Sequence, residues 1–125
     1  FRRVLFRSCP QKAFTKRRDG VVFINTNRCD GCMDCVSACP YNAPQFDQMS
    51  RKASKCNFCD TRVQDGLKPA CVVACSMGAI QTVDLIQGYP EGTVGRIDGF
   101  PDTRLTKPSI VFYPLKPRTR YWLKD

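Results

Sequence analysis

Residues 29–40 read CDGCMDCVSACP, with cysteines at Cys29, Cys32, Cys35 and Cys39 and a proline after the last. Three thiolates spaced two residues apart can surround three corners of an iron–sulfur cube within one tight turn. The fourth cysteine, one helical turn further on, points away and usually binds a different cube. Four ordinary buried cysteines would show this spacing only by coincidence. The run therefore predicts a [4Fe–4S] site.

The remaining cysteines lie on both sides of this run. A second group of four follows it, in the order Cys56, Cys59, Cys71 and Cys75. Taken alone, this spacing also suits a Cys₄ zinc ribbon. Beside residues 29–40 it favours iron–sulfur ligation, because two unrelated structural metals would be the stranger coincidence. The ninth cysteine, Cys9, precedes Pro10 and matches the end of an earlier C-x-x-x-C-P unit.

Composition limits the other classes of function. The chain has 125 residues, nine cysteines, no histidine and a formal net charge of +9. An odd number of closely spaced cysteines argues against a complete disulfide framework, and the lack of histidine excludes Rieske, Cys₃His and haem–histidine ligation. The basic residues are spread along the chain without interleaved aromatics, so we expect no nucleic-acid partner. No apolar run of about 18 residues is present that could span a membrane.

Residues 1–8, FRRVLFRS, match the in-frame translation of a sequencing-library adapter. This match predicts that the segment is an artefact and that the genuine chain starts near Cys9 as a truncated reading frame. Without its three arginines the net charge of +9 becomes 9 − 3 = +6. We therefore expect residues 1–8 to pack against nothing.

The rest of the chain is punctuated by glycine and proline. We expect strands at residues 21–24, around Phe46 and at 79–83, a polar approach to Cys56 at 52–55, and helices at 33–38 and 60–65. Pro40 should stop the first helix and Gly66 the second. The prediction is an α+β, loop-rich domain over residues 9–86. An extended tail over 87–125 follows, packed in part by residues 110–113 and Trp122.

Two segments carry a resemblance to a known family: residues 29–45 (CDGCMDCVSACPYNAPQ) and 55–80 (KCNFCDTRVQDGLKPACVVACSMGAI). At this separation they resemble the iron–sulfur subunit of the dimethyl sulfoxide reductase family of molybdopterin oxidoreductases. The resemblance implies a C-terminal fragment of a ferredoxin-like [4Fe–4S] protein that transfers electrons. It also implies two partners, a molybdopterin catalytic subunit and a membrane-anchor subunit, and a place at the periplasmic face of the membrane.

The resemblance also implies which cysteines share a cluster. The family pairs its second cysteine group with its third, and its first group with its fourth. Carried over to this chain, Cys9 completes the cluster of Cys29, Cys32 and Cys35. The other cysteines would be ligands of clusters that are incomplete here, namely Cys39, Cys56, Cys59, Cys71 and Cys75. Ser76 stands where the family has proline, which puts the local turn in doubt.

Two other functions stay open. A free two-cluster ferredoxin would join Cys75 to the cluster of Cys29, Cys32 and Cys35, and would join Cys39 to the second group. A zinc-dependent binding module would belong to another class. Lys55 and Arg28, each next to a ligand cysteine, either favour the reduced cluster or are solvated surface charges. No nucleophile–base pair or paired carboxylates are evident, so we expect an electron-transfer subunit and not an enzyme.

Overall fold

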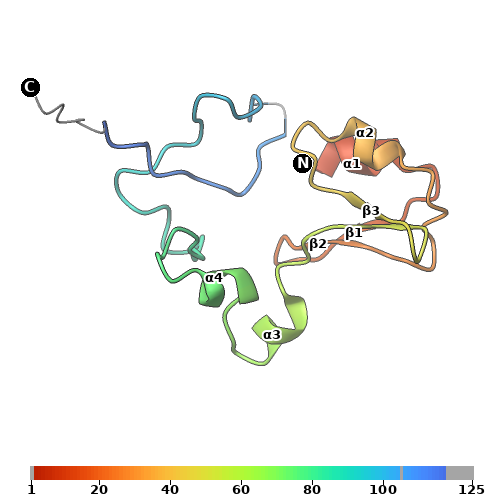
Figure 1. Cartoon of the computed structure of the whole chain (residues 1–125), viewed down its shortest axis with the longest axis horizontal. Helices are drawn as coiled ribbons and strands as arrows, with labels where there is room; N and C mark the ends of the chain where they lie inside the picture. The colour runs from red at the N-terminus through yellow and green to blue at the C-terminus, as the bar shows by residue number, and fades with distance from the viewer. Residues whose placement is uncertain (1, 105, 118–125) are drawn as a thin grey trace, which may run out of the picture.

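A computed structural model describes residues 2–104 and 106–117 of the chain. The elements are short: α1 (Arg2–Ser8), β1 (Phe14–Lys16), β2 (Val22–Ile24), α2 (Asp34–Ala38), β3 (Gln45–Asp47), β4 (Lys52–Ser54), α3 (Asp60–Gln64) and α4 (Ala70–Ala74). Helices α1 and α2 lie together on one side of the strands, and α3, α4 and the tail extend away from them (Figure 1). Among the described residues, no helix combines the length and apolar character needed to cross a bilayer.

The strands form two separate antiparallel hairpins, β1 with β2 and β3 with β4. In the first hairpin Phe14 pairs with Ile24, and the Asp19 carboxylate accepts the backbone N–H of Val21 in the turn. In the second, the Asp47 carboxylate accepts the N–H of Met49 in the same manner. Aspartate favours such turns because its side chain satisfies backbone donors two residues on. The predicted strands at 21–24 and around Phe46 are confirmed.

The helices match the sequence-based prediction in part. Helix α2 begins after Met33, whose left-handed φ of 66° starts the turn, and it ends before Pro40 as expected. Helix α3 ends at Gln64, two residues before Gly66, which adopts a φ of 74° that favours glycine. Helix α4, which starts directly after Pro69, was not predicted. The strand predicted at residues 79–83 is wrong: no strand of the described residues lies alongside this segment to pair with it.

The buried core is small and lies between α1, α2 and the hairpins. Its members are Leu5, Phe14, Cys35, Cys39 and Ala53, each at most 6 % exposed. Leu5 is only 1 % exposed, and the ring of Phe6 lies 6.0 Å from that of Phe14. The expectation that residues 1–8 pack against nothing is therefore wrong, because Leu5 precedes Cys9 by one helical turn and faces the core. The adapter origin of these residues stays a prediction.

Two cationic side chains fasten the segment that carries α3 to the first hairpin. Arg17 donates to Asp60 at the start of α3, at 2.5 Å, and also pairs with Asp19 in its own turn. Its guanidinium lies 5.2 Å from the ring centre of Phe23. Lys55 Nζ donates to the carbonyl of Val22 at 2.7 Å. These contacts hold α3 in place although neither α3 nor α4 contains a buried residue.

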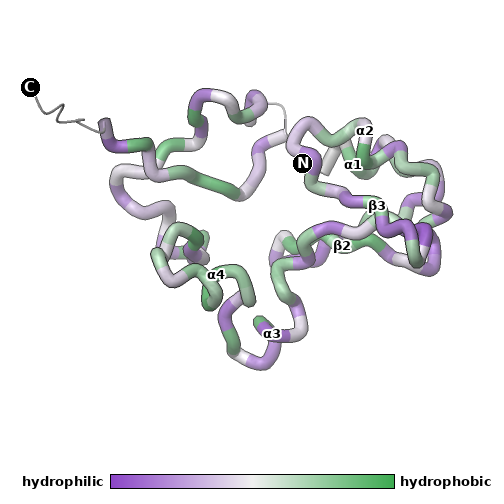
Figure 2. Tube along the Cα trace, viewed as in Figure 1, coloured by the Kyte–Doolittle hydropathy of each residue, from purple (hydrophilic) through white to green (hydrophobic). Residues whose placement is uncertain are grey.

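The tail contacts the domain through aromatic rings. Phe100 stacks on Tyr41 with 5.1 Å between ring centres and meets Phe112 edge-on at 4.8 Å. The hydroxyls of Tyr41 and Thr106 share a hydrogen bond, and Val94 and Phe112 form an isolated bridge. Apolar stretches line this part of the chain in Figure 2. The apolar run at 110–113 does pack in part, as predicted, whereas Trp122 lies outside the described residues.

Candidate iron–sulfur site

Four cysteines gather around one cavity between the first hairpin and α2. The residues that line it are Cys9, Cys29, Cys32 and Cys35 together with Ala13, Phe14, Ile24, Asp30, Met33 and Ala53. The enclosed part of the cavity is small, about 10 Å³. Four thiol-bearing residues therefore converge on one space.

A repeated turn holds the sulfurs of Cys9, Cys39 and Cys75. In each case the backbone N–H of the alanine four residues later donates to the cysteine sulfur, at 3.3 Å for Ala13, 3.5 Å for Ala43 and 3.3 Å for Ala79. The residue before each alanine has a left-handed φ, as for Lys12, Asn42 and Gly78. The turn after Cys75 is the same although Ser76 replaces proline. The departure from the family pattern therefore leaves the local backbone unchanged.

The C-x-x-C loops that open the two cysteine groups, residues 29–32 and 56–59, share a second repeated geometry. The Asp30 carboxylate accepts the N–H of Cys32 at 3.1 Å, and the Asn57 amide oxygen accepts the N–H of Cys59 at 3.1 Å. The third residue of each loop is left-handed, with φ of 80° at Gly31 and 61° at Phe58. Asp or Asn directly after the first cysteine therefore fixes each loop in the same bend.

Contacts between distant segments complete the cavity. The N–H of Ala53, in β4, donates to the sulfur of Cys29 at 3.4 Å. The side-chain amide of Gln11, in the turn after Cys9, donates to Asp30 at 3.2 Å. Together these two hydrogen bonds join the Cys9 turn, the Cys29 loop and the second hairpin around one space. N–H donors to sulfur stabilise the thiolate form, which is the form that binds iron.

Electrostatics show that the four thiols act on one another. Burial raises the pKa of Cys35, and the thiolates of Cys29, Cys32 and Cys9 raise it further. Negative charges that repel one another in a shared cavity are stabilised by a cationic centre bound between them. The thiol donor set and the N–H···S hydrogen bonds therefore fit an iron–sulfur cube. Within the described ranges, no three Cys, Asp or Glu side chains converge enough for a single metal ion. A cube does not need such a group, since each cysteine binds a different iron corner.

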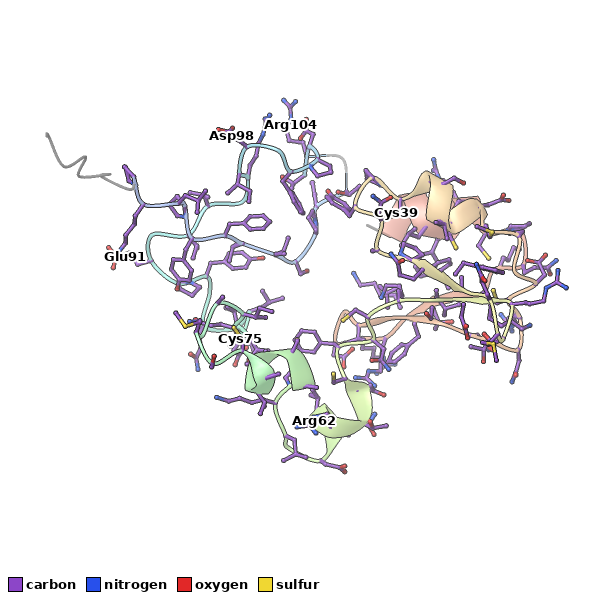
Figure 3. All side chains as sticks on the ribbon, in the orientation of Figure 1. Cys39, Arg62, Cys75, Glu91, Asp98 and Arg104 are labelled. Atoms are coloured by element: carbon purple, nitrogen blue, oxygen red, sulfur yellow. The ribbon has the colours of Figure 1, made fainter. Side chains whose placement is uncertain are left out.

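The other cysteines lie elsewhere. Cys39 is 3 % exposed in the core but does not line the cavity. Cys75 lies at the end of α4, on a separate part of the molecule from Cys39 (Figure 3). Its pKa is lowered, first by the N–H of Ala79. Cys59 accepts the N–H of Ala70, the residue before Cys71, at 3.4 Å. The second group therefore has preformed N–H···S contacts, while Cys56 and Cys71 remain exposed.

Gly31 offers a direct test of the loop geometry. A Cβ at this position would lie 2.3 Å from the backbone carbonyl oxygen of Arg51, whereas at Gly20 it would meet nothing within 4 Å. Both glycines have positive φ. We expect Gly31→Ala to lower the free energy of unfolding by roughly 2–5 kcal/mol, the sum of backbone strain and steric overlap. Gly20→Ala should lower the free energy of unfolding only by the backbone strain, about 1–2 kcal/mol.

The measurement is guanidinium-induced loss of the visible absorbance of the iron-loaded chain. Equal effects of the two alanine substitutions would show that the cysteine loop does not rest on the turn between β3 and β4.

Comparison with known proteins identifies the class of site. The sequence profile described as the 4Fe-4S dicluster domain matches residues 5–85. The chain belongs to the 4Fe-4S dicluster domain family. The predicted cofactor class is thereby confirmed, and the resemblance to iron–sulfur subunits of reductases is confirmed at the level of the family. The short strands and helices agree with a ferredoxin-like 4Fe-4S domain, the expected fold class.

Individual relatives of this dicluster protein are components of reductases. It is 39 % identical over 109 residues to one chain of the anaerobic dimethyl sulfoxide reductase of Haemophilus influenzae, covering 86 % of this protein and 53 % of the relative. It is 37 % identical over 103 residues to one chain of the polysulfide reductase of Wolinella succinogenes, covering 82 % of this chain and 53 % of the relative. The beta subunit of the perchlorate reductase of Dechloromonas aromatica is 42 % identical over 69 residues. The match covers 54 % of this chain and 21 % of the relative. The dicluster protein thus spans about half the length of the first two relatives.

Some functional residues of the site were not predicted from the sequence. The N–H donors of Ala13, Ala43 and Ala79 follow a repeated Cys-x-x-x-Ala spacing that is visible in the sequence and could have been noticed. Lys52, whose ammonium donates to the carbonyl of Cys29, comes from 23 residues further along the chain and leaves no local signal. Of the two basic residues that were predicted, Lys55 is half-buried and Arg28 is exposed.

Proposed function

We propose that this chain transfers electrons through [4Fe–4S] clusters as the iron–sulfur subunit of a membrane-associated molybdopterin oxidoreductase. The observation that carries the proposal is the cavity lined by Cys9, Cys29, Cys32 and Cys35. When bound there, a cube accepts and releases one electron at a time. The relatives in dimethyl sulfoxide, polysulfide and perchlorate reductases are each one component of a larger enzyme, which supports the same role.

The residues of the chain then have defined tasks. Cys9, Cys29, Cys32 and Cys35 bind the iron corners, and the backbone donors of Ala13 and Ala53 hydrogen-bond two of these sulfurs. Cys35 is buried and Cys32 is exposed, so one side of the site faces the core and the other faces solvent. Cys39, Cys56, Cys59, Cys71 and Cys75 serve as ligands of further clusters.

Partners and location are part of the proposal. A molybdopterin catalytic subunit carries the substrate chemistry, because this chain offers thiolate ligands without a nucleophile and base of its own. A membrane-anchor subunit holds the complex at the membrane, and the periplasmic face is the proposed side. Residues 9–86 form the cluster-binding domain, and the tail from residue 87 onward serves as docking surface.

Anaerobic purification tests the proposed function. We expect iron and acid-labile sulfide in equal amounts, and a brown visible absorbance that bleaches when dithionite is added. Stoichiometric zinc without sulfide would contradict the proposal and favour the zinc-binding module. Zinc and iron are measured on the same sample, so that one preparation separates the two functions.

A further inference from the structure

Strand β4 contacts one ligand cysteine in two ways. The N–H of Ala53 donates to the sulfur of Cys29 at 3.4 Å, and the ammonium of the preceding residue, Lys52, donates to the carbonyl oxygen of Cys29. Ala53 is 2 % exposed, so this part of the strand is packed against the site. The two contacts bring a positive charge to the backbone of a residue whose sulfur lines the cavity.

Lys52 is placed where its positive charge can act on the site around Cys29. The side chain is half-buried, and a charge that is partly removed from water is screened less than an exposed one. Arg28, the sequence neighbour of Cys29, is exposed and therefore better screened. The cavity wall also carries the carboxylate of Asp30, which acts in the opposite sense. Lys52 is the cation with a described contact to a cavity cysteine.

We propose that Lys52 is a positioning residue that raises the reduction potential of the cluster bound by Cys9, Cys29, Cys32 and Cys35. The inference rests on the proposed electron-transfer function. In the step concerned, one electron from an external donor enters the cube, no bond forms or breaks, and the negative charge of the cube with its thiolates grows by one. A nearby ammonium stabilises the more negative, reduced form more than the oxidised form.

The test is an anaerobic redox titration of the iron-loaded chain with dithionite as reductant, followed by electron paramagnetic resonance. For Lys52→Met we expect a lower potential, with the ratio of oxidised to reduced cluster about three- to tenfold higher at a fixed applied potential. At 59 mV per tenfold change for one electron, this is roughly 30–60 mV. Lys52→Arg keeps the charge and should stay near the parent value. Lys16→Met, which changes an exposed strand lysine in β1, is the control for net charge and should change little.

Several outcomes would overturn the inference. One is a reduction potential of Lys52→Met equal to that of the parent. Another is a drop in the reduction potential of Lys52→Arg or Lys16→Met as large as that of Lys52→Met. If Lys52→Met fails to hold iron, Lys52→Gln keeps a hydrogen-bond donor without the charge, and its potential decides the question in the same way. A parent chain that binds zinc without iron and sulfide would instead refute the proposed function itself, so the two failures are distinguishable.

Discussion

Replacing Cys9 with serine will abolish the [4Fe–4S] signal of this chain, and replacing Cys75 with serine will leave that signal in place. Cys9 lines the same cavity as Cys29, Cys32 and Cys35, whereas Cys75 lies at the end of α4 outside it. A hydroxyl is a poor substitute for a thiolate as an iron ligand, so a cube that loses one of four cysteines should not assemble stably. We expect iron content to fall to near zero in Cys9→Ser.

The pair of variants also separates the electron-transfer subunit from the free ferredoxin. Both substitutions remove one thiol from the same kind of turn, in which an alanine N–H donates to the sulfur. They are therefore matched in local geometry, but only Cys9 lines the cavity. Iron, sulfide and the electron paramagnetic resonance spectrum of the reduced protein are measured for both. Retained signal in Cys9→Ser with loss in Cys75→Ser would refute the proposed ligand set and favour the free two-cluster ferredoxin.

Removal of iron will unfold most of residues 9–80. The described core consists of few side chains, and two of them, Cys35 and Cys39, are themselves cysteines. The hairpins have three-residue strands, and α3 and α4 contain no buried residue. With so little apolar burial, the free energy of metal binding accounts for most of the free energy of folding. The structured state should therefore exist only while the site is loaded.

Amide hydrogen exchange measures this outcome. The N–H of Asn25, bonded to the carbonyl of Ala13 at 2.8 Å, is a suitable reporter for the first hairpin. After chelation its exchange should approach within about tenfold the rate of an unstructured peptide. Treatment with the same chelator already saturated with iron is the control and should preserve protection. Native-like protection in the iron-free chain would show that the apolar core suffices alone.

The sequence predicted those parts of the fold where local chemistry dictates the backbone. Cysteine spacing and Pro40 gave the limits of α2, and Gly66 gave the end of α3. Strands β1 and β4 were missed because three-residue strands such as Lys52–Ser54 are too short and polar to show alternation. Helix α4 was not predicted, although Pro69 directly before it is a residue that favours the start of a helix.

For the site, the sequence and the resemblance named every cysteine but not the groups that support them. The N–H···S hydrogen bonds of Ala53 and Ala70 arise from strand and helix packing, which no local pattern encodes. The burial of Leu5 was missed because its segment was excluded from the fold. The error at residues 79–83 has a related cause, since an apolar run becomes a strand only when a partner strand is available.

The turn between β3 and β4 is a point at which this protein could be attached to an electrode. Met49 at its tip is 94 % exposed, and two residues later the carbonyl of Arg51 packs against Gly31 in the cysteine loop. Doubling the length of a flexible loop costs only about 0.6 kcal/mol in closure entropy. A surface-binding peptide inserted after Met49 would therefore tether the protein to an electrode with its cysteine loop a few residues from the anchor. The hairpin that supports the loop thus also offers a route along which current could be drawn from it.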